Sequence, residues 1–538
     1  MKACRWLGWL GCVCVMVSSF GCLGVTGTGP EVEAAVCEAA DSEAVLEAGP
    51  TTRPASGDVS PPQLSAAVVS LRQCLEWALQ HNLRLSVERL TPDVRDAQVV
   101  EALSAFDALF TGGYTYDHDE AEQASAVSGV GSLTSETSAG QFGLQKRLLT
   151  GAQAHVGLDW DHVGTNSPFA TLNPRTDASV VVGLTQPLLR GGGVSVNTAA
   201  IRIARNARLG SVHLFRKSVE DTLAAVEEVY WTLYLSIESV RVRQRQLERA
   251  NDRLKQARLF VDAGRAAPVE VISAEAEVAA IQTDIIVAEN NVRRAEDALK
   301  RLVNRPDLPV GSQTRLVPAD APGDRPVEVD VPKAVVMALA NRPDLKAAEL
   351  DQANADVTLD VARHERLPRL NLSLEYRLHG LDRRLENSLE ELSQFEFDGH
   401  QVALILQIPL GNRAAKSRYD QARLVHEQTQ RSISDLRQQI ALEIKRIADD
   451  LRRDRGLITT ARKAKDLANK EYLDEKARYE SQRSTRVDLL QAQTRLVARE
   501  LEEIRAVVGF NIDLAGLHRL QGTYLEHHNI EITPVPGD

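Results

Sequence analysis

The chain carries two versions of a short motif, Thr185-Gln186-Pro187-Leu188 and Gln407-Ile408-Pro409-Leu410. Each version leads through a long stretch with helical spacing to a second shared motif, in which a helix breaker precedes an apolar, acidic, apolar run. This second motif is Gly264-Arg265-Ala266-Ala267-Pro268-Val269-Glu270-Val271-Ile272 in one half and Ser484-Thr485-Arg486-Val487-Asp488-Leu489-Leu490 in the other. Landmarks that recur in the same order indicate an internal duplication.

A third landmark precedes both versions: an amphipathic helix that ends in Ala-Leu, at Cys74–Asn82 and again at Ala334–Asn341. We therefore expect a first repeat over 68–303, a proline-rich linker over 304–330, a second repeat over 331–522 and a C-terminal tail over 523–538. Between its first two landmarks the N-terminal repeat is longer than its counterpart, so it holds additional structure there.

The proline-free stretches predict long helices. Apolar residues after Asn197 alternate in steps of four and three, which is typical of a coiled-coil seam. A helix over 197–263 would be about 100 Å long, whereas the returning helix over 268–302 would reach only about 52 Å. The helix over 83–106 adds about 36 Å, so each repeat predicts one long helix beside two short ones. The turns would lie at Gly264 and near Arg483.

Between the helices the pattern changes to alternation, which predicts β-strands. In the second repeat, Leu370 to Leu378 and Val402 to Ile408 each alternate between apolar and other residues. In the first repeat, Phe110 to Tyr116, Val156 to Trp160 and Ala178 to Leu184 do the same. Strands with one apolar and one polar face suit a lipid-facing, water-lined barrel, although a sheet packed on the helices would also alternate.

Composition excludes several classes of protein. The chain has 538 residues and a net charge of -11, which argues against a nucleic-acid-binding protein. Beyond residue 24 no apolar run approaches the ~20 residues of a membrane-spanning helix, so a helical channel or transporter is excluded. All six cysteines lie at or before Cys74, so a disulfide framework in the body of the chain is excluded as well.

The N-terminus is typical of an export signal, 1–22, followed by a disordered tether, 23–67. Lys2 and Arg5 precede an apolar core that ends at Gly21-Cys22. Gly before Cys is typical of a lipoprotein signal, in which Cys22 would be lipidated. Cleavage after Gly21 by an ordinary signal peptidase is the alternative.

No enzyme, cofactor site or metal site is expected. The glycines at 191–193 lack a phosphate-loop pattern. Asp117-His118-Asp119 and Asp159-Trp160-Asp161-His162 are better explained as loop or pore-lining charges than as metal ligands. The pair His527-His528 falls on a polar tail and is expected to be solvated.

Together these motifs resemble the outer-membrane factor family typified by TolC, over about 68–522. The resemblance implies an α+β membrane protein: a trimer whose strands share one outer-membrane β-barrel and whose helices continue it as a periplasmic coiled-coil barrel. It also implies passive export in a tripartite efflux or type I secretion system, with a periplasmic adaptor (membrane fusion) protein and an inner-membrane pump as partners. The alternative is a periplasmic coiled-coil adaptor or scaffold without a pore.

The same resemblance implies a gate at the periplasmic tip. Tyr479 matches the family's locking tyrosine and Asp488 its first acidic position, whereas Gln491 stands at the second. Ser484 stands at the locking arginine position, with Arg483 and Arg486 close by. The equivalent residues of the first repeat are Glu270 and Ser273. Because the double-aspartate pattern is missing, strong blockage by cations is not implied, and Asp488 is alternatively a solvated carboxylate in the first turn of a helix.

The family pattern has two strands per repeat, but the first repeat here predicts two more, over 139–148 and 152–163, joined at Thr150-Gly151. Each protomer would then supply six strands and a trimer eighteen. The alternative is a hairpin that projects from a twelve-stranded barrel.

Overall fold

The computed structural model describes residues 66–124, 129–324, 327–481 and 483–531. The expected signal, most of the expected tether and Cys22 lie outside the described residues. In the described part of the chain, no helix combines the length and the apolar character needed to cross a membrane.

Six antiparallel strands form one sheet in the order β2-β3-β4-β5-β7-β8. Their bounds are β2 Ala108–Glu122, β3 Ser132–Arg147, β4 Gln153–Thr165, β5 Arg175–Pro187, β7 Arg369–Asp382 and β8 Asp398–Gln407. The first repeat therefore supplies four strands and the second supplies two. The additional pair predicted in the first repeat is confirmed as β3 and β4, which begin and end within a few residues of the expected positions except at the N-terminus of β3.

The two faces of the sheet differ in chemistry. The register aligns Tyr114, Gly140, Trp160 and Ala178 on one face across β2 to β5. The other apolar members of this face include Phe110, Phe142, Leu144, Val156, Leu374, Val402 and Leu404. The opposite face carries Gln141, Asp159, Asp161, Asp177 and Ser179, which line a hollow of about 270 Å³. Alternation along every strand thus sorts the side chains, as the sequence predicts.

A short helix, α9 Leu385–Gln394, covers part of the apolar face. Its Leu392 packs against Ala178 and Leu378. The hydroxyl of Ser388 donates a 2.6 Å hydrogen bond to the carbonyl oxygen of Gly380, where the backbones approach too closely for any side chain. The sequence analysis missed α9, whose Leu385, Leu389 and Leu392 recur at helical spacing.

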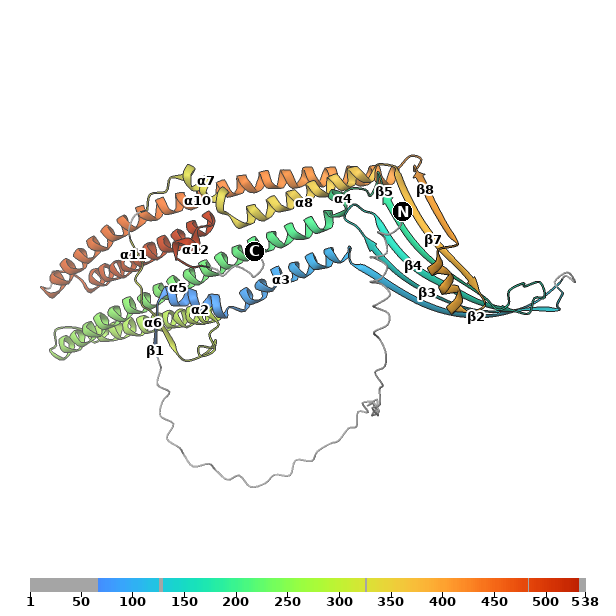
Figure 1. Ribbon diagram of the computed structural model, residues 1–538. Helices are drawn as coiled ribbons and strands as arrows, with labels where there is room; N and C mark the ends of the chain where they lie inside the picture. Colours follow the sequence, from blue (N-terminus) through green and yellow to red (C-terminus); the bar gives the residue numbers. More distant parts are fainter. Residues whose placement is uncertain (1–65, 125–128, 325–326, 482, 532–538) are drawn as a thin grey trace, which may run out of the picture. The chain divides into compact units, whose positions relative to one another are not determined.

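Each repeat builds one long helix and two short ones, as predicted. In the first, α5 Ala199–Asp262 packs against α3 Leu83–Ser104 and α6 Val269–Val303. In the second, α10 Arg413–Glu480 packs against α8 Pro343–Glu365 and α11 Arg486–Gln521. The contacts between repeats run from α5 to α8 and from α5 to α11 (Figure 1). The helices nearest the sheet therefore form a layer in the order α3, α5, α8, α10.

Several short elements pack beside the long helices. These are β1 Ala66–Val69, α2 Leu71–His81, α4 Val194–Asn197, β6 Arg315–Pro318, α7 Val331–Asn341 and α12 Tyr524–His527. β1 pairs in parallel with β6, which lies within the segment expected as a linker. The largest apolar cluster, around Leu75, Leu223, Tyr230, Leu233 and Leu299, joins α2, α5 and α6.

Candidate functional site

The two helix turns that the sequence predicts are present at the ends of α5 and α10. The first contains Gly264, whose φ of 69° lies in the left-handed region, and leads into α6 at Val269. The second leads into α11, where Thr485 is the N-cap and its hydroxyl oxygen accepts a 3.3 Å hydrogen bond from the amide of Asp488. An N-cap of this kind satisfies an amide that has no partner within the helix.

Arg486 joins these two turns. Its guanidinium donates to the carbonyl oxygen of Glu270 over 2.9 Å and to the carboxylate of Glu270 over 3.0 Å. The same guanidinium lies 3.7 Å from the carboxylate of Glu277, one heptad further along α6. The first turn of α11 is therefore bound to α6, so the tips of the two repeats are connected by charge.

A second arginine extends this contact. Arg253 of α5 pairs with Glu277 and also donates to the side-chain oxygen of Gln493 on α11. Arg253, Glu277 and Arg486 are mostly buried, so their mutual attraction is only weakly screened by solvent. We call Arg253, Glu270, Glu277, Arg486 and Gln493 the tip network.

The remaining residues expected at the gate lie in two other environments. Tyr479 is half-buried and packs on the apolar cluster of Tyr472, Leu489, Ala492 and Leu496, within the α10–α11 hairpin. Asp488, Gln491, Ser273 and Arg483 are exposed. The hydroxyl of Ser484 donates to Glu475 on the same hairpin.

The structure thus brings together Glu270 and Arg486 from the expected set. Arg253, Glu277 and Gln493 were missed by the sequence analysis. The spacing of Glu277, seven residues after Glu270, places both on one face of α6 and could have indicated it.

A second polar group lies where α11 ends beside α5. The carboxylate of Glu227, which is 7% exposed, accepts hydrogen bonds from the hydroxyl of Tyr524 over 2.6 Å and from the indole of Trp231 over 3.2 Å. His528 lies 3.3 Å from the same carboxylate. Burial alone would raise the pKa of Glu227, but these partners more than offset it, so its pKa is lowered.

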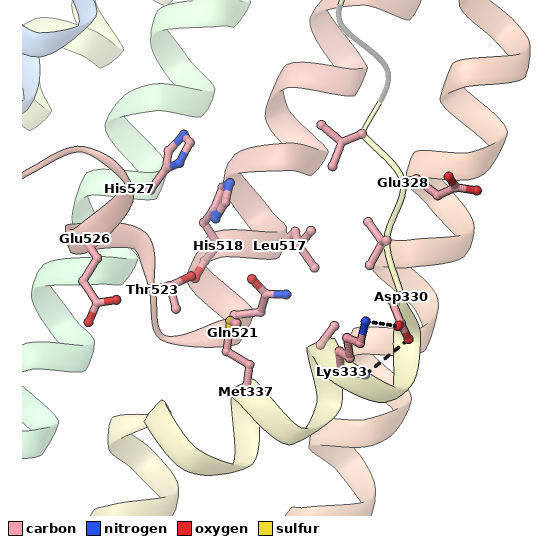
Figure 2. A pocket seen from close by; sticks show the side chains of 13 residues that line it. Glu328, Asp330, Lys333, Met337, Leu517, His518, Gln521, Thr523, Glu526 and His527 are labelled. Atoms are coloured by element: carbon pink, nitrogen blue, oxygen red, sulfur yellow. Dashed lines mark hydrogen bonds and ion pairs between the residues drawn. The ribbon is translucent and has the colours of Figure 1, made fainter.

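The expectation that His527-His528 is solvated is confirmed for His527, which is exposed, and wrong for His528, whose side chain is only 18% exposed. The ring of His527 stacks on that of His518 with centroids 3.9 Å apart, and His528 packs on Tyr524. The cause is α12, which folds the chain after α11 back against α5. His518 and His527 also line a hollow of about 430 Å³, with Lys333 paired to Asp330 on another side of it (Figure 2).

The aspartate and histidine runs on the strands are distributed over the sheet. His118 lies 3.4 Å from Glu136, Asp161 lies 3.5 Å from Arg175, and His162 hydrogen-bonds Thr176 over 2.7 Å. Among the residues that the structure describes, no three His, Cys, Asp or Glu side chains are grouped so that they could hold a metal ion.

Comparison with known proteins places these features in a family. The sequence model of the family described as "Outer membrane efflux protein" matches residues 151–305 and 334–523, which is more than half of the chain. The chain belongs to the outer membrane efflux protein family. The resemblance inferred from the repeated motifs is therefore confirmed. A search among curated proteins found no match.

Solved structures of outer-membrane proteins share the fold of this family member. VceC of Vibrio cholerae is 15% identical with a TM-score of 0.60, over 84% of this chain and 96% of that one. The outer-membrane channel OprN is 16% identical with a TM-score of 0.59, over 84% and 90%. CmeC of Campylobacter jejuni is 13% identical with a TM-score of 0.58, over 86% and 90%. The mixed helix and strand architecture is shared with all three.

Proposed function

We propose that this efflux protein is the exit duct of a tripartite efflux or type I secretion system. Three copies would share one β-barrel in the outer membrane and extend their helices into the periplasm as a coiled-coil barrel. Substrate would pass through passively, delivered by a periplasmic adaptor and an inner-membrane pump. The proposal rests on family membership and on one structural observation, the open edges of the protomer.

Both layers of the protomer end in elements that need a neighbour. In the sheet formed by the described residues, β2 and β8 are the edge strands, each paired on one side only. In the helical layer, α3 packs against α5, and α10 packs against α8 on the other side. Unpaired strand edges are not tolerated in lipid, so a membrane sheet must close on itself.

The outer side of α3 is apolar. Leu83, Val87, Leu90 and Val94 follow a four-three-four spacing and are between 55% and 67% exposed. That spacing is a coiled-coil seam without its partner helix. The exposed Leu424 and Val425 on α10 provide the complementary apolar side at the opposite edge. Edge α3 of one copy would thus meet edge α10 of the next, a head-to-tail contact that generates a ring.

The tip network would hold the periplasmic end closed, and Asp488 and Tyr479 would take the family's gating roles. Lipidation of Cys22 would add a second anchor in the membrane, and the mass of the mature N-terminal peptide tests it. We also propose that the sequence consists of two repeats joined by a linker, with the bounds given in the sequence analysis.

Purified protein in planar bilayers tests the function directly. A duct gives discrete conductance steps and makes liposomes permeable, whereas an adaptor or scaffold without a pore gives neither.

Leu90→Glu should reduce the trimer seen by native mass measurement in detergent, because it places a charge in the seam. Arg89→Glu, an adjacent exposed position, is the matched control. A wild-type chain that is only monomeric would contradict the proposal.

A further inference from the structure

The inserted hairpin β3–β4 decides how wide the proposed duct is. We infer that β3 and β4 form part of the barrel wall. The closed barrel then has eighteen strands, and its pore is as wide as the tunnel formed by the helices. This inference rests on the proposed function. The competing arrangement has β2 paired directly with β5, and the hairpin projecting from a twelve-stranded barrel.

The strand pairing of the hairpin favours its place in the barrel wall over a projecting arrangement. β3 pairs with β2 over 15 residues and with β4 over 13, and β4 pairs with β5 over 11. The contact between the two strands that need no insertion, β5 and β7, is of similar length, at 12 residues. A projecting hairpin would have to give up the β2–β3 and β4–β5 ladders, and each backbone group left unpaired in lipid costs several kcal/mol.

The side chains of the hairpin indicate that its apolar face contacts lipid, on the same side of the sheet as the apolar face of the other strands. Phe142, Leu144 and Val156 are each nearly half exposed and lie on the apolar face. Gln141 of β3 and Asp159 of β4, which are paired with each other, lie on the opposite, polar face. In a projecting hairpin this apolar band would meet water, whereas in the wall it meets lipid.

Helix α9 provides an independent argument. Leu158 and Trp160 of β4 pack against the cluster formed by Leu392 of α9, Ala178 of β5 and Leu378 of β7. The ring of Trp160 covers Gly140 of β3, where any side chain would collide with the indole. The inserted strands are thus joined to both β5 and the second repeat by side chains as well as by backbone pairing.

The circumferences of the two layers agree. Six strands spaced ~4.8 Å apart and tilted by ~40° occupy about 37 Å of circumference per copy. The four helices α3, α5, α8 and α10 occupy about 36 Å at ~9 Å each. Four strands would occupy only about 25 Å and would narrow the duct by a third. Three copies with six strands leave a pore of roughly 25 Å after side chains, against roughly 14 Å for twelve strands. That width suits polymeric cargo as well as small solutes.

Removal of the hairpin tests the inference. In the variant that joins Glu122 directly to Asn166, β2 is free to pair with β5. Neutral polymers of about 20 Å diameter, added from the outer side of a bilayer, should enter the wild-type pore and lower its conductance but should leave the shortened variant unaffected. Equal polymer exclusion by both proteins would overturn the inference. Absence of any channel in the wild type would instead contradict the proposed function.

A matched pair of cysteines in the full chain decides the matter if the shortened variant fails to fold. Val156→Cys on the apolar face should react with a lipid-soluble maleimide and resist a charged thiosulfonate. Asp159→Cys on the polar face should react with the charged reagent. The unchanged chain, treated in parallel, measures the background reaction of the native Cys22 and Cys37, whereas Cys74 is buried. Rapid labelling of Val156→Cys by the charged reagent would place the hairpin in water and exclude the eighteen-stranded wall.

Discussion

Arg486, in the first turn of α11, binds both the carbonyl and the carboxylate of Glu270, in the first turn of α6. One side chain thus connects the tips of two repeats that are far apart in the sequence. Asp488, which the family resemblance places in the gate, lies two residues away and is exposed. The structure therefore separates a residue that binds the tips together from a residue that presents charge at the tip.

Replacing Arg486 by Gln should loosen the tip. The change removes one of the two cations beside Glu277, which is 11% exposed, and both hydrogen bonds that Glu270 accepts from the guanidinium; a hydrogen bond to a charged group is worth about 1.5–3 kcal/mol. We expect faster amide hydrogen exchange in the first turns of α6 and α11, and a larger single-channel conductance. Arg483→Gln removes the same charge from an exposed side chain and should change neither. Equal effects of the two variants would show that only net charge matters at the tip.

Asp488→Asn should change how cations act on the channel. The carboxylate is exposed and accepts a 2.6 Å hydrogen bond from the hydroxyl of Thr485, so neutralising it removes a charge without emptying a packed site. Conductance with and without a divalent cation measures the effect.

Tyr479→Phe, which keeps the ring in its apolar cluster, tests the locking role of the hydroxyl. Unchanged conductance in both variants would refute the gating roles carried over from the family.

The sequence predicted the elements better than the contacts between them. Periodicity found both long helices, both turns and the inserted hairpin, because alternation and heptad spacing are properties of a single segment. Three members of the tip network, Arg253, Glu277 and Gln493, were missed because they come from three helices, and only the packing of α5 against α11 brings them together. The same limit explains His528: nothing local indicates that α12 returns to Glu227.

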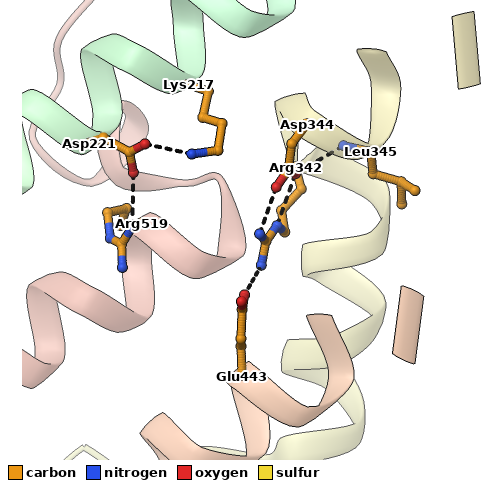
Figure 3. Close-up of polar contacts among 7 residues, drawn as sticks. All are labelled: Lys217, Asp221, Arg342, Asp344, Leu345, Glu443 and Arg519. Carbon is orange, nitrogen blue, oxygen red and sulfur yellow. Dashed lines mark hydrogen bonds and ion pairs between the residues drawn. The ribbon is translucent and has the colours of Figure 1, made fainter. Parts of the chain in front are cut away.

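Arg342, between α7 and α8, is a structural site that the sequence did not reveal. Its guanidinium binds Asp344 twice, over 2.7 and 3.0 Å, and Glu443 of α10 over 2.5 Å (Figure 3). Burial alone would raise the pKa of Asp344, but Arg342 more than offsets this and lowers it. Arg342→Ala should lower the free energy of unfolding by about 3 kcal/mol, since it leaves the carboxylate of Asp344, which is only 18% exposed, without its cation.

The nearby cluster of Lys217, Asp221 and Arg519 provides the control for that variant (Figure 3). These side chains are about one-third exposed, so Arg519→Ala should cost no more than about 1 kcal/mol. Chemical denaturation of both variants measures the difference. Equal losses would mean that solvent reaches Arg342 in the assembled protein.

Asp513 on α11 should make the protein less stable as the pH rises. Burial, followed by the hydrogen bond and charge of Asp454, raises the pKa of Asp513 to about 7. The folded state therefore holds a proton that the unfolded state has released above its usual pKa near 4, and stability falls between about pH 4 and pH 7. Asp513→Asn should abolish this decline and stabilise the protein at pH 8 by on the order of 1–2 kcal/mol. A variant that is less stable at pH 8 would show that the Asp513 charge is needed by Arg453.

His518 should act in the opposite direction. Burial, followed by the charges of His527 and His528, lowers the pKa of His518 to about 4, although Glu227 opposes this change. In the unfolded chain the same ring takes up a proton near pH 6.5, so stability is full above that pH and is lost as the pH falls towards 4. The loss would reach at most about 3 kcal/mol, because each tenfold difference in proton affinity between the folded and unfolded states corresponds to about 1.4 kcal/mol.

Thermal unfolding of the detergent-solubilised protein between pH 4 and pH 8 measures this loss. His518→Gln keeps a polar side chain in the hollow but cannot gain a proton. In the Asp513→Asn background it should therefore remove the fall in unfolding temperature that acidification causes. His379→Gln, on the sheet, is the control for removing a histidine elsewhere and should leave the slope unchanged. Because Asp513 contributes a slope of opposite sign, the wild-type profile alone does not isolate either group. The double variant His518→Gln, Asp513→Asn should have a flatter profile than Asp513→Asn alone, and a slope as steep as that of Asp513→Asn would assign the pH dependence to other groups.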